Sequence, residues 1–177
     1  ILLELQKINF PTAYLIPKKE GGFISNSKEG KVLIYEFKEG SNPELNHQTT
    51  GEIAKYLAEL NSFKGFVKYP RKNIIHIDYC FELIELFKIA PFQYPEIYEY
   101  FEEQTQYLLK PVSKILPRGL IHGDVFPDNT IFQNGILSAL IDFEEACVDN
   151  LLMEIGMCIN GFCFINNTLD LSLMETF

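Results

Sequence analysis

Two apolar runs joined by the dipeptide Asn134-Gly135 constrain the fold of this chain more than any other stretch of its sequence. The runs read TIF at 130–132 and ILSALIDF at 136–143. Asn-Gly favours a type I′ turn, because both central residues of that turn have positive φ, and such turns join antiparallel strands. At a rise of about 3.3 Å per residue, the second strand would return Asp142 to the start of the first. The sequence therefore predicts a β-hairpin that brings Asp142 beside Asn129.

The segment before this hairpin is crowded with polar side chains. It reads IHGDVFPDN at 121–129 and follows a predicted strand at 119–122. Each part has an ordinary interpretation: His-x-Asp is most often a turn, Pro-Asp-Asn fits a type I turn, and a lone His is most often packed in a core. With Asp142 they nevertheless supply an Asp, an Asn and a second Asp carried by a hairpin. That spacing is typical of phosphoryl-transfer enzymes.

The phosphoryl-transfer interpretation gives each of these residues a role. Asp124 is the expected catalytic residue, which orients an acceptor hydroxyl and takes its proton. Asn129 and Asp142 are the expected Mg²⁺ ligands, because Mg²⁺ prefers oxygen donors and leaves its other positions to waters and phosphates. His122 and Asp128 are expected to support the catalytic loop, His122 without transferring a proton. The implied cofactors are ATP and Mg²⁺.

The remaining signals change near Gly40 from strand-like to helix-like. A helix is expected at 2–8, followed by three antiparallel strands at 13–17, 23–25 and 31–37 between turn-forming clusters. Further helices are expected around 49–60, at 95–109 and, as a buried core helix, within 151–164. Between Gly65 and Pro95 the signals conflict, because residues 74–81 alternate like a strand while 82–88 fit a helix equally well, and the stretch stays open.

The helix around 49–60 has the clearest amphipathic pattern. Thr49-x-x-Glu52 matches a capping box at its start. Its apolar face is expected to consist of Ile53, Tyr56, Leu57 and Leu60.

Composition restricts the partners. The net charge of −9 opposes binding to nucleic acid and to anionic membrane surfaces. The longest apolar run, at 151–164, is too short for a bilayer span. Four Cys without a C-x-x-C pair indicate buried reduced thiols and a cytoplasmic protein. A small-molecule substrate is the expected partner.

The quoted motifs resemble those of the aminoglycoside phosphotransferase and choline kinase superfamily. HGDVFPDN at 122–129 and IDF at 141–143 carry that resemblance, and the stretches at 116–129 and 146–164 are similar to the homoserine kinases of this fold. The resemblance implies a protein-kinase-like, bilobal α+β fold with a catalytic β-hairpin. Residues 1–39 would be a partial small lobe with the hinge, and 40–177 a mostly helical catalytic lobe. The hinge backbone at Glu36 and Phe37 would hold adenine.

The resemblance has gaps. The superfamily places a phosphate loop and an ATP-binding Lys on strands that would precede this chain, and further helices after it. The chain is therefore expected to be a fragment, incomplete at both ends and inactive alone, or a degenerate copy that binds ATP poorly. The superfamily also carries Asp where this chain has Glu154, in a mainly structural position.

The function implied is ATP- and Mg²⁺-dependent phosphorylation of the homoserine hydroxyl, in threonine biosynthesis. Choline, an aminoglycoside or methylthioribose are alternative acceptors, and the cationic ones suit the net charge of −9. A non-catalytic binding or scaffold protein with a kinase-like fold is the alternative from another class.

Overall fold

The computed structural model describes residues 1–65, 73–89, 94–109 and 116–177. Where the sequence signals conflict, residues 77–89 form a helix and 74–76 a turn before it, so the strand-like alternation at 74–81 forms no strand. The helices are α1 (Leu2–Lys7), α2 (His47–Ser62), α3 (Ile77–Ile89), α4 (Pro95–Leu109), α5 (Leu151–Phe162) and α6 (Leu171–Thr176). The strands are β1 (Ser25–Ser27), β2 (Gly30–Val32), β3 (Arg118–Ile121), β4 (Thr130–Gln133), β5 (Ile136–Leu140), β6 (Cys147–Asn150), β7 (Phe164–Ile165) and β8 (Thr168–Leu169).

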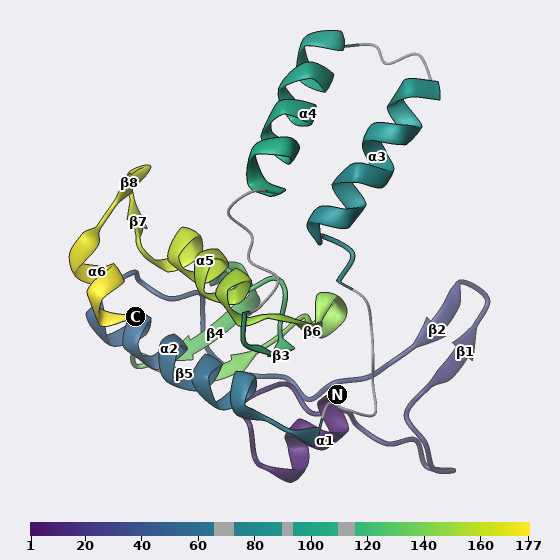
Figure 1. Cartoon of the computed structure of the whole chain (residues 1–177). Coiled ribbons are helices and arrows are strands. Elements are labelled where there is room, and N and C mark those ends of the chain that lie inside the picture. Colours follow the sequence, from purple (N-terminus) through teal and green to yellow (C-terminus); the bar gives the residue numbers. More distant parts are fainter. Residues whose placement is uncertain (66–72, 90–93, 110–115) are drawn as a thin grey trace.

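The strands pair as four separate antiparallel ribbons. In sequence the partners are β1 with β2, β3 with β6, β4 with β5 and β7 with β8. Helix α2 lies along β5, and α5 lies above β3 and β6 (Figure 1). Helices α3 and α4 stand side by side and project away from this body (Figure 1). The ring of Phe87 in α3 packs edge-on against Tyr98 and Phe101 in α4.

One hydrophobic core joins the helices to the hairpin of β4 and β5. As expected, α2 buries Ile53, Leu57 and Leu60, while Tyr56 packs partly buried against the core. The remaining buried members of the core are Leu5, Phe10, Leu120, Val125, Phe132, Leu137, Leu140, Cys158, Phe162, Cys163 and Leu173. The side chain of Asn61 at the end of α2 donates to the carbonyl of Leu120 at 2.9 Å, which fixes the helix against β3.

The start of α2 differs from the expected capping box. Asn46 is the N-cap, and its side chain accepts the N–H groups of Gln48 and Thr49. The Thr49 hydroxyl accepts the Asn46 N–H in return. The prediction of Thr49 as the cap was wrong because the helix begins about one turn earlier, which places Thr49 at position N3 of the box.

The expected strand at 31–37 is interrupted. Only Gly30–Val32 forms a regular strand, paired with Ser25–Ser27 rather than with 23–25. Further along, the N–H of Ile16 donates to the carbonyl of Ile34 and the N–H of Glu36 to that of Tyr14, which holds an antiparallel ribbon with a single bridge. The large side chains of this segment are exposed, so little packing is available to regularise it.

The expected core helix at 151–164 is present as α5 but is buried on one face only. It buries Glu154, Cys158 and Phe162, while Leu152 remains 57% exposed. In the described ranges, no helix is long and apolar enough to cross a bilayer. All four Cys are free thiols, three of them buried and Cys80 partly buried.

Candidate active site

The predicted hairpin forms with the predicted turn. Asn134 and Gly135 both have positive φ, 54° and 76°, as a type I′ turn requires. Strands β4 and β5 pair from Gln133 with Ile136 to Thr130 with Leu140, with a register shift after Ile131. The second strand therefore ends at Leu140 rather than at residue 143.

Beyond this pairing, the hairpin brings the Asp142 segment to the catalytic loop. The N–H of Ile141 donates to the carbonyl of Asn129 at 2.9 Å. Asp142 follows immediately and has left-handed backbone angles, φ 61° and ψ 62°, which Asp tolerates better than most residues. Its side chain is exposed at the N-cap of a one-turn helix, Phe143–Glu145.

Asp124 and Asn129 are joined directly. The amide nitrogen of Asn129 donates to the Asp124 carbonyl at 2.9 Å and to Oδ2 of its carboxylate at 2.7 Å. Both donors of that amide are thus used by Asp124. Among the residues that the structure describes, none donates to the Asn129 side-chain oxygen, which leaves an oxygen donor for a cation.

His122 links the catalytic loop to the strand end that precedes Asp142. It is fully buried, and its Nδ1 accepts the N–H of Asp124 at 3.3 Å. Its Nε2 lies 2.8 Å from the carbonyl of Ile141. Burial lowers the pKa of His122 to about 4. The ring is therefore neutral at physiological pH, with its proton on Nε2, since only that tautomer serves both partners.

Glu154 is part of the site although the sequence suggested only a structural role. It is fully buried on α5, and its two oxygens accept the N–H groups of His122 at 2.7 Å and Gly123 at 3.1 Å. Burial raises the pKa of Glu154 to about 7, against the opposing effect of these two bonds. The available signal was an acidic residue inside an otherwise apolar stretch.

The close approach of the catalytic loop to the backbone of Glu145 requires glycine at position 123. Its φ is +85°, and a Cβ atom there would lie 2.8 Å from the carbonyl oxygen of Glu145. A residue with a side chain would therefore push the catalytic loop away from the segment that follows Asp142.

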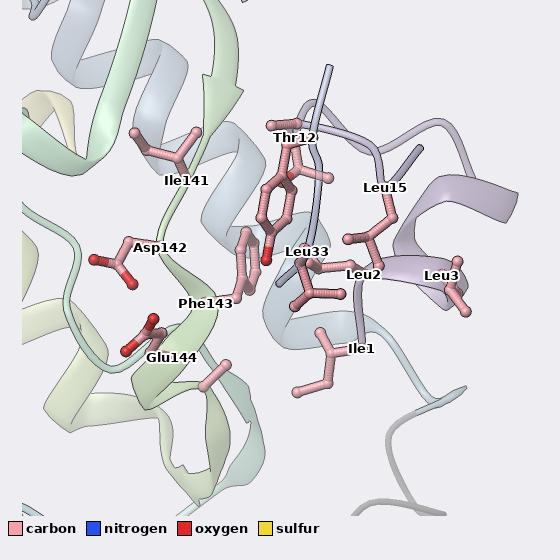
Figure 2. A pocket seen from close by; sticks show the side chains of 13 residues that line it. Ile1, Leu2, Leu3, Thr12, Leu15, Leu33, Ile141, Asp142, Phe143 and Glu144 are labelled. Carbon is pink, nitrogen blue, oxygen red and sulfur yellow. The ribbon is translucent and has the colours of Figure 1, made fainter. Parts of the chain in front are cut away.

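An open cavity of about 1030 Å³ lies next to Asp142. Figure 2 shows the Asp142 and Glu144 carboxylates on one side of it and aliphatic side chains of the N-terminal segment on the other. It is lined by Ile1, Leu2, Leu3, Thr12, Ala13, Leu15, Leu33, Tyr35, Ile141, Asp142, Phe143, Glu144 and Ala146. The lining combines a mostly apolar wall with acidic groups at its edge.

Three of the expected site residues lie outside this cluster. Asp128 is exposed on a one-turn helix, Pro127–Asn129. Glu36 accepts the N–H of Tyr14 at 3.2 Å and pairs with Lys38, which lowers the pKa of Glu36. The Phe37 side chain is 89% exposed. No hydrogen bond or ion pair between described residues joins Glu36 or Phe37 to the catalytic loop.

The donor set suits a hard cation. In the part of the chain that the structure describes, no three His, Cys, Asp or Glu side chains gather as a metal cage. The oxygen donors at the base of the hairpin are the Asn129 amide oxygen and the Asp142 carboxylate. Mg²⁺ commonly binds to one or two such groups and to substrate phosphates, so the residues present fit that ion.

Known protein sequences resemble this chain over most of its length. A profile described as "Phosphotransferase enzyme family" matches residues 15–170. The homoserine kinase of Parvibaculum lavamentivorans is 31% identical over 162 residues, which are 89% of this chain and 49% of that protein. The homoserine kinase of Gluconobacter oxydans is 54% identical over 54 residues, which are 30% of this chain and 17% of that protein. The chain thus spans about half the length of the first of these relatives.

A solved structure shares the fold. Amicoumacin kinase hAmiN, in complex with AMP-PNP, Ca²⁺ and Ami, superposes with a TM-score of 0.69 at 16% identity. The match covers 97% of this chain and 56% of that one. The structure of an aminoglycoside-3'-phosphotransferase of type VIII superposes with a TM-score of 0.70 at 11% identity, over 99% of this chain and 67% of that one. The expected α+β fold of the aminoglycoside phosphotransferase type is confirmed by these likenesses.

Proposed function

The chain belongs to the phosphotransferase enzyme family, and from that premise we propose that the protein containing it transfers the γ-phosphoryl group of ATP to the hydroxyl of homoserine. The observation that carries this proposal is the hydrogen bond of 2.7 Å between Asn129 and the Asp124 carboxylate. This bond holds together the loop that contains Asp124 and Asn129. The hairpin brings the Asp142 segment to that loop, where the N–H of Ile141 donates to the carbonyl of Asn129. One catalytic carboxylate and two oxygen donors are thus held by neighbouring turns.

Asp124 is the proposed catalytic residue. Asn129 engages its Oδ2 atom, which leaves Oδ1 for the hydroxyl of the acceptor. Phosphoryl transfer proceeds mostly through loose transition states, so the carboxylate mainly orients the hydroxyl and accepts its proton late. Orientation of this kind accounts for a large part of the rate enhancement in such reactions.

Asn129 and Asp142 are the proposed ligands of Mg²⁺. A bound Mg²⁺ offsets the negative charge of the phosphate oxygens and orients them. That contribution matters in a protein with a net charge of −9, which otherwise repels a triphosphate. The side-chain amide of Asn129 would then serve both partners, with its nitrogen on Asp124 and its oxygen on the cation.

The backbone at Glu36 and Phe37 is the proposed contact for adenine. Among the described residues, none makes a backbone hydrogen bond to Phe37, so its N–H and carbonyl are available. The side chains here do not form a pocket, because Phe37 is almost fully exposed and Glu36 is paired with Lys38. Recognition of the base would therefore depend on the main chain.

The choice of homoserine rests on the similar proteins named homoserine kinase, one of which matches 89% of the chain. A cationic acceptor such as choline or an aminoglycoside is the second candidate, because it suits a net charge of −9. The net charge does not distinguish these acceptors, whereas the rate of ATP consumption with each of them does.

The test is a Mg·ATP consumption assay on the full-length protein with homoserine, choline, methylthioribose and kanamycin. We expect turnover with homoserine and its loss in Asp124→Ala. Turnover with another of these acceptors alone would replace the homoserine assignment. Unchanged turnover in Asp124→Ala would contradict the assignment of the catalytic residue.

A further inference from the structure

We propose that the turn at Asn134-Gly135 is a site of spontaneous covalent modification, in which the backbone nitrogen of Gly135 displaces ammonia from the Asn134 side chain. The isoaspartate that results loosens the hairpin that carries Asp142. This inference concerns the chemistry of the hairpin itself, and it does not require homoserine to be the acceptor.

The modification needs only the chain and water. The nitrogen of Gly135 attacks the side-chain carbonyl carbon of Asn134 and a C–N bond forms. The bond from that carbon to the amide nitrogen breaks, and ammonia leaves with the proton of the Gly135 N–H. Water then opens the five-membered imide at either of its two carbonyl groups. One opening gives aspartate, and the other gives isoaspartate, in which the main chain runs through the side-chain methylene.

The sequence and the fold together select Asn134 for this reaction. A side chain on the following residue obstructs the attacking nitrogen, and glycine has none. Glycine follows Asn134 and also Asn160, and both Asn residues are exposed. Asn160 lies in the last turn of α5, where a Cβ atom on Gly161 would be 3.2 Å from the carbonyl oxygen of Val125. Helix geometry and this packing restrain the second site, whereas Asn134 lies in a two-residue turn.

The turn must open before the imide can form. Asn134 and Gly135 have φ angles of 54° and 76°. The imide ring requires a ψ angle at Asn134 that a left-handed residue does not have. The pair that closes the turn, Gln133 with Ile136, lies at the exposed end of the hairpin, and Ile136 is 57% exposed. Local opening of such an end requires little free energy, so the modification proceeds from the opened turn.

The Gln48 side chain at the start of α2 limits this opening. It packs against the turn, because a Cβ atom on Gly135 would lie 2.6 Å from its Cδ atom and 2.9 Å from its Oε1 atom. In Gln48→Ala this contact is lost. The turn should then open more often, and the modification should be about twofold faster or more.

The two products differ in their effect on the hairpin. Isoaspartate adds one carbon atom to the main chain, so the two-residue turn no longer fits, and the turn sets the register of the strands. At the other end of the hairpin the N–H of Ile141 donates to the carbonyl of Asn129, next to Asp142. A hairpin with a disrupted turn holds this end less firmly. Aspartate keeps the length of the main chain and tolerates positive φ, so it should preserve the hairpin.

The first test maps the modification in the full-length protein after incubation at mildly alkaline pH, with an L-isoaspartyl methyltransferase as the probe. We expect about tenfold more isoaspartate at Asn134 than at Asn160 or Asn166, because only the first combines an open turn with a following glycine. Asn166 is the control for the turn, since Asn166 and Asn167 also have positive φ, 50° and 62°. Absence of isoaspartate at Asn134, or equal amounts at Asn134 and Asn166, would overturn the proposal.

The second test compares two variants that keep the turn. Asn134→Gly cannot form the imide, and Asn134→Asp reproduces the harmless product, while Gly-Gly and Asp-Gly both suit a type I′ turn. Fully converted wild-type protein should lose protection of the Ile141 amide against hydrogen exchange and should lose kcat about threefold or more. Incubated Asn134→Gly and fresh Asn134→Asp should match fresh wild type in both. The exchange measurement decides the proposal whatever the acceptor, and an equal loss of protection in incubated Asn134→Gly contradicts it.

Discussion

Two regions of the molecule contribute to the cavity beside Asp142, and they are held in different ways. In the catalytic segment, residues 119–146, Ile121, His122 and Val125 are completely buried. Side chains from other elements bind its backbone, as Glu154 does. In the N-terminal strands, residues 13–37, main-chain bonds such as Ile16 to Ile34 hold the ribbon, while Ile34 is 58% exposed.

The difference indicates where the positions of the reacting groups are fixed. Groups whose positions relative to a phosphoryl group must be accurate to a fraction of an ångström need support from several buried contacts. A flat purine held by main-chain groups needs only a backbone with free donors and acceptors. Substitutions should therefore be severe in the catalytic segment and mild in the N-terminal strands.

The largest expected effect is that of Asp124→Ala on the rate. If Asp124 orients the hydroxyl and accepts its proton as proposed, its loss should lower kcat about 10³-fold, measured by ADP release from the full-length protein. Asp78→Ala, at an exposed carboxylate on α3, is the control and should retain activity. A decrease in kcat of less than tenfold in Asp124→Ala would contradict the expectation that substitutions are severe in the catalytic segment and mild in the N-terminal strands.

Asp142→Asn should be the next most severe change. Removing the proposed carboxylate ligand of Mg²⁺ should lower kcat about 10²- to 10³-fold and raise the Mg²⁺ concentration needed for half-maximal activity. A Mg²⁺ titration of the rate measures both effects. Glu144→Gln, at the neighbouring exposed carboxylate of the same cavity, should leave the Mg²⁺ dependence unchanged. Equal effects of the two substitutions would contradict the assignment of Asp142.

A pair of truncations compares the two regions by stability. Leu140→Ala removes a fully buried side chain and should lower the free energy of unfolding by about 2–5 kcal/mol. Ile34→Ala removes an exposed one and should change it by less than about 0.5 kcal/mol. Denaturant unfolding of the full-length variants measures both. Similar losses in the two variants would show that the N-terminal strands are held as firmly as the catalytic segment.

The free energy of unfolding should depend on pH through Glu154. The pKa of Glu154 is raised by folding from 4.5 to about 7, so its stabilising contribution is complete below about 4.5 and is lost as pH rises through 7. Relative to Glu154→Gln, the wild-type protein should therefore lose about 3 kcal/mol of unfolding free energy across this window. A difference that stays constant with pH would mean that Glu154 is not held as the structure indicates.

The smallest expected effect concerns Phe37. Because the proposed adenine contact is the backbone, Phe37→Ala should change the KM for ATP by less than about threefold. Phe37→Pro removes the N–H donor and should raise that KM about fivefold or more. Steady-state kinetics with varied ATP distinguishes the two. A larger effect of Ala than of Pro would show that the aromatic ring, not the main chain, binds the base.

The sequence predicted the hairpin because its signal is local. Asn134-Gly135 fixes the turn, and the turn together with the register shift after Ile131 brings Ile141, and Asp142 after it, to Asn129. The pairing of β3 with β6 was not predicted, because strands 118–121 and 147–150 are distant in sequence and no turn joins them. Local signals also misplaced the cap of α2, since Thr49-x-x-Glu52 matches a capping box in sequence while the structure forms the box with Asn46 and Thr49.

The role of Glu154 could not be read from its neighbours in sequence. An acidic residue in an apolar helix can pair with a cation, coordinate a metal or accept backbone N–H groups, and the choice depends on what lies opposite. Here the opposite surface is the backbone of residues 122 and 123. The proposed catalytic residues could be identified from the sequence because their spacing is local, whereas the group that binds their loop lies on a distant helix.

The most direct test of this account is a crystal structure of the full-length protein with Mn²⁺ and AMP-PNP, in which anomalous scattering locates the cation. We predict a cation bound to the Asn129 side-chain oxygen and the Asp142 carboxylate, with the γ-phosphate facing Asp124. A cation bound without Asn129 and Asp142, or a γ-phosphate directed away from Asp124, would contradict it.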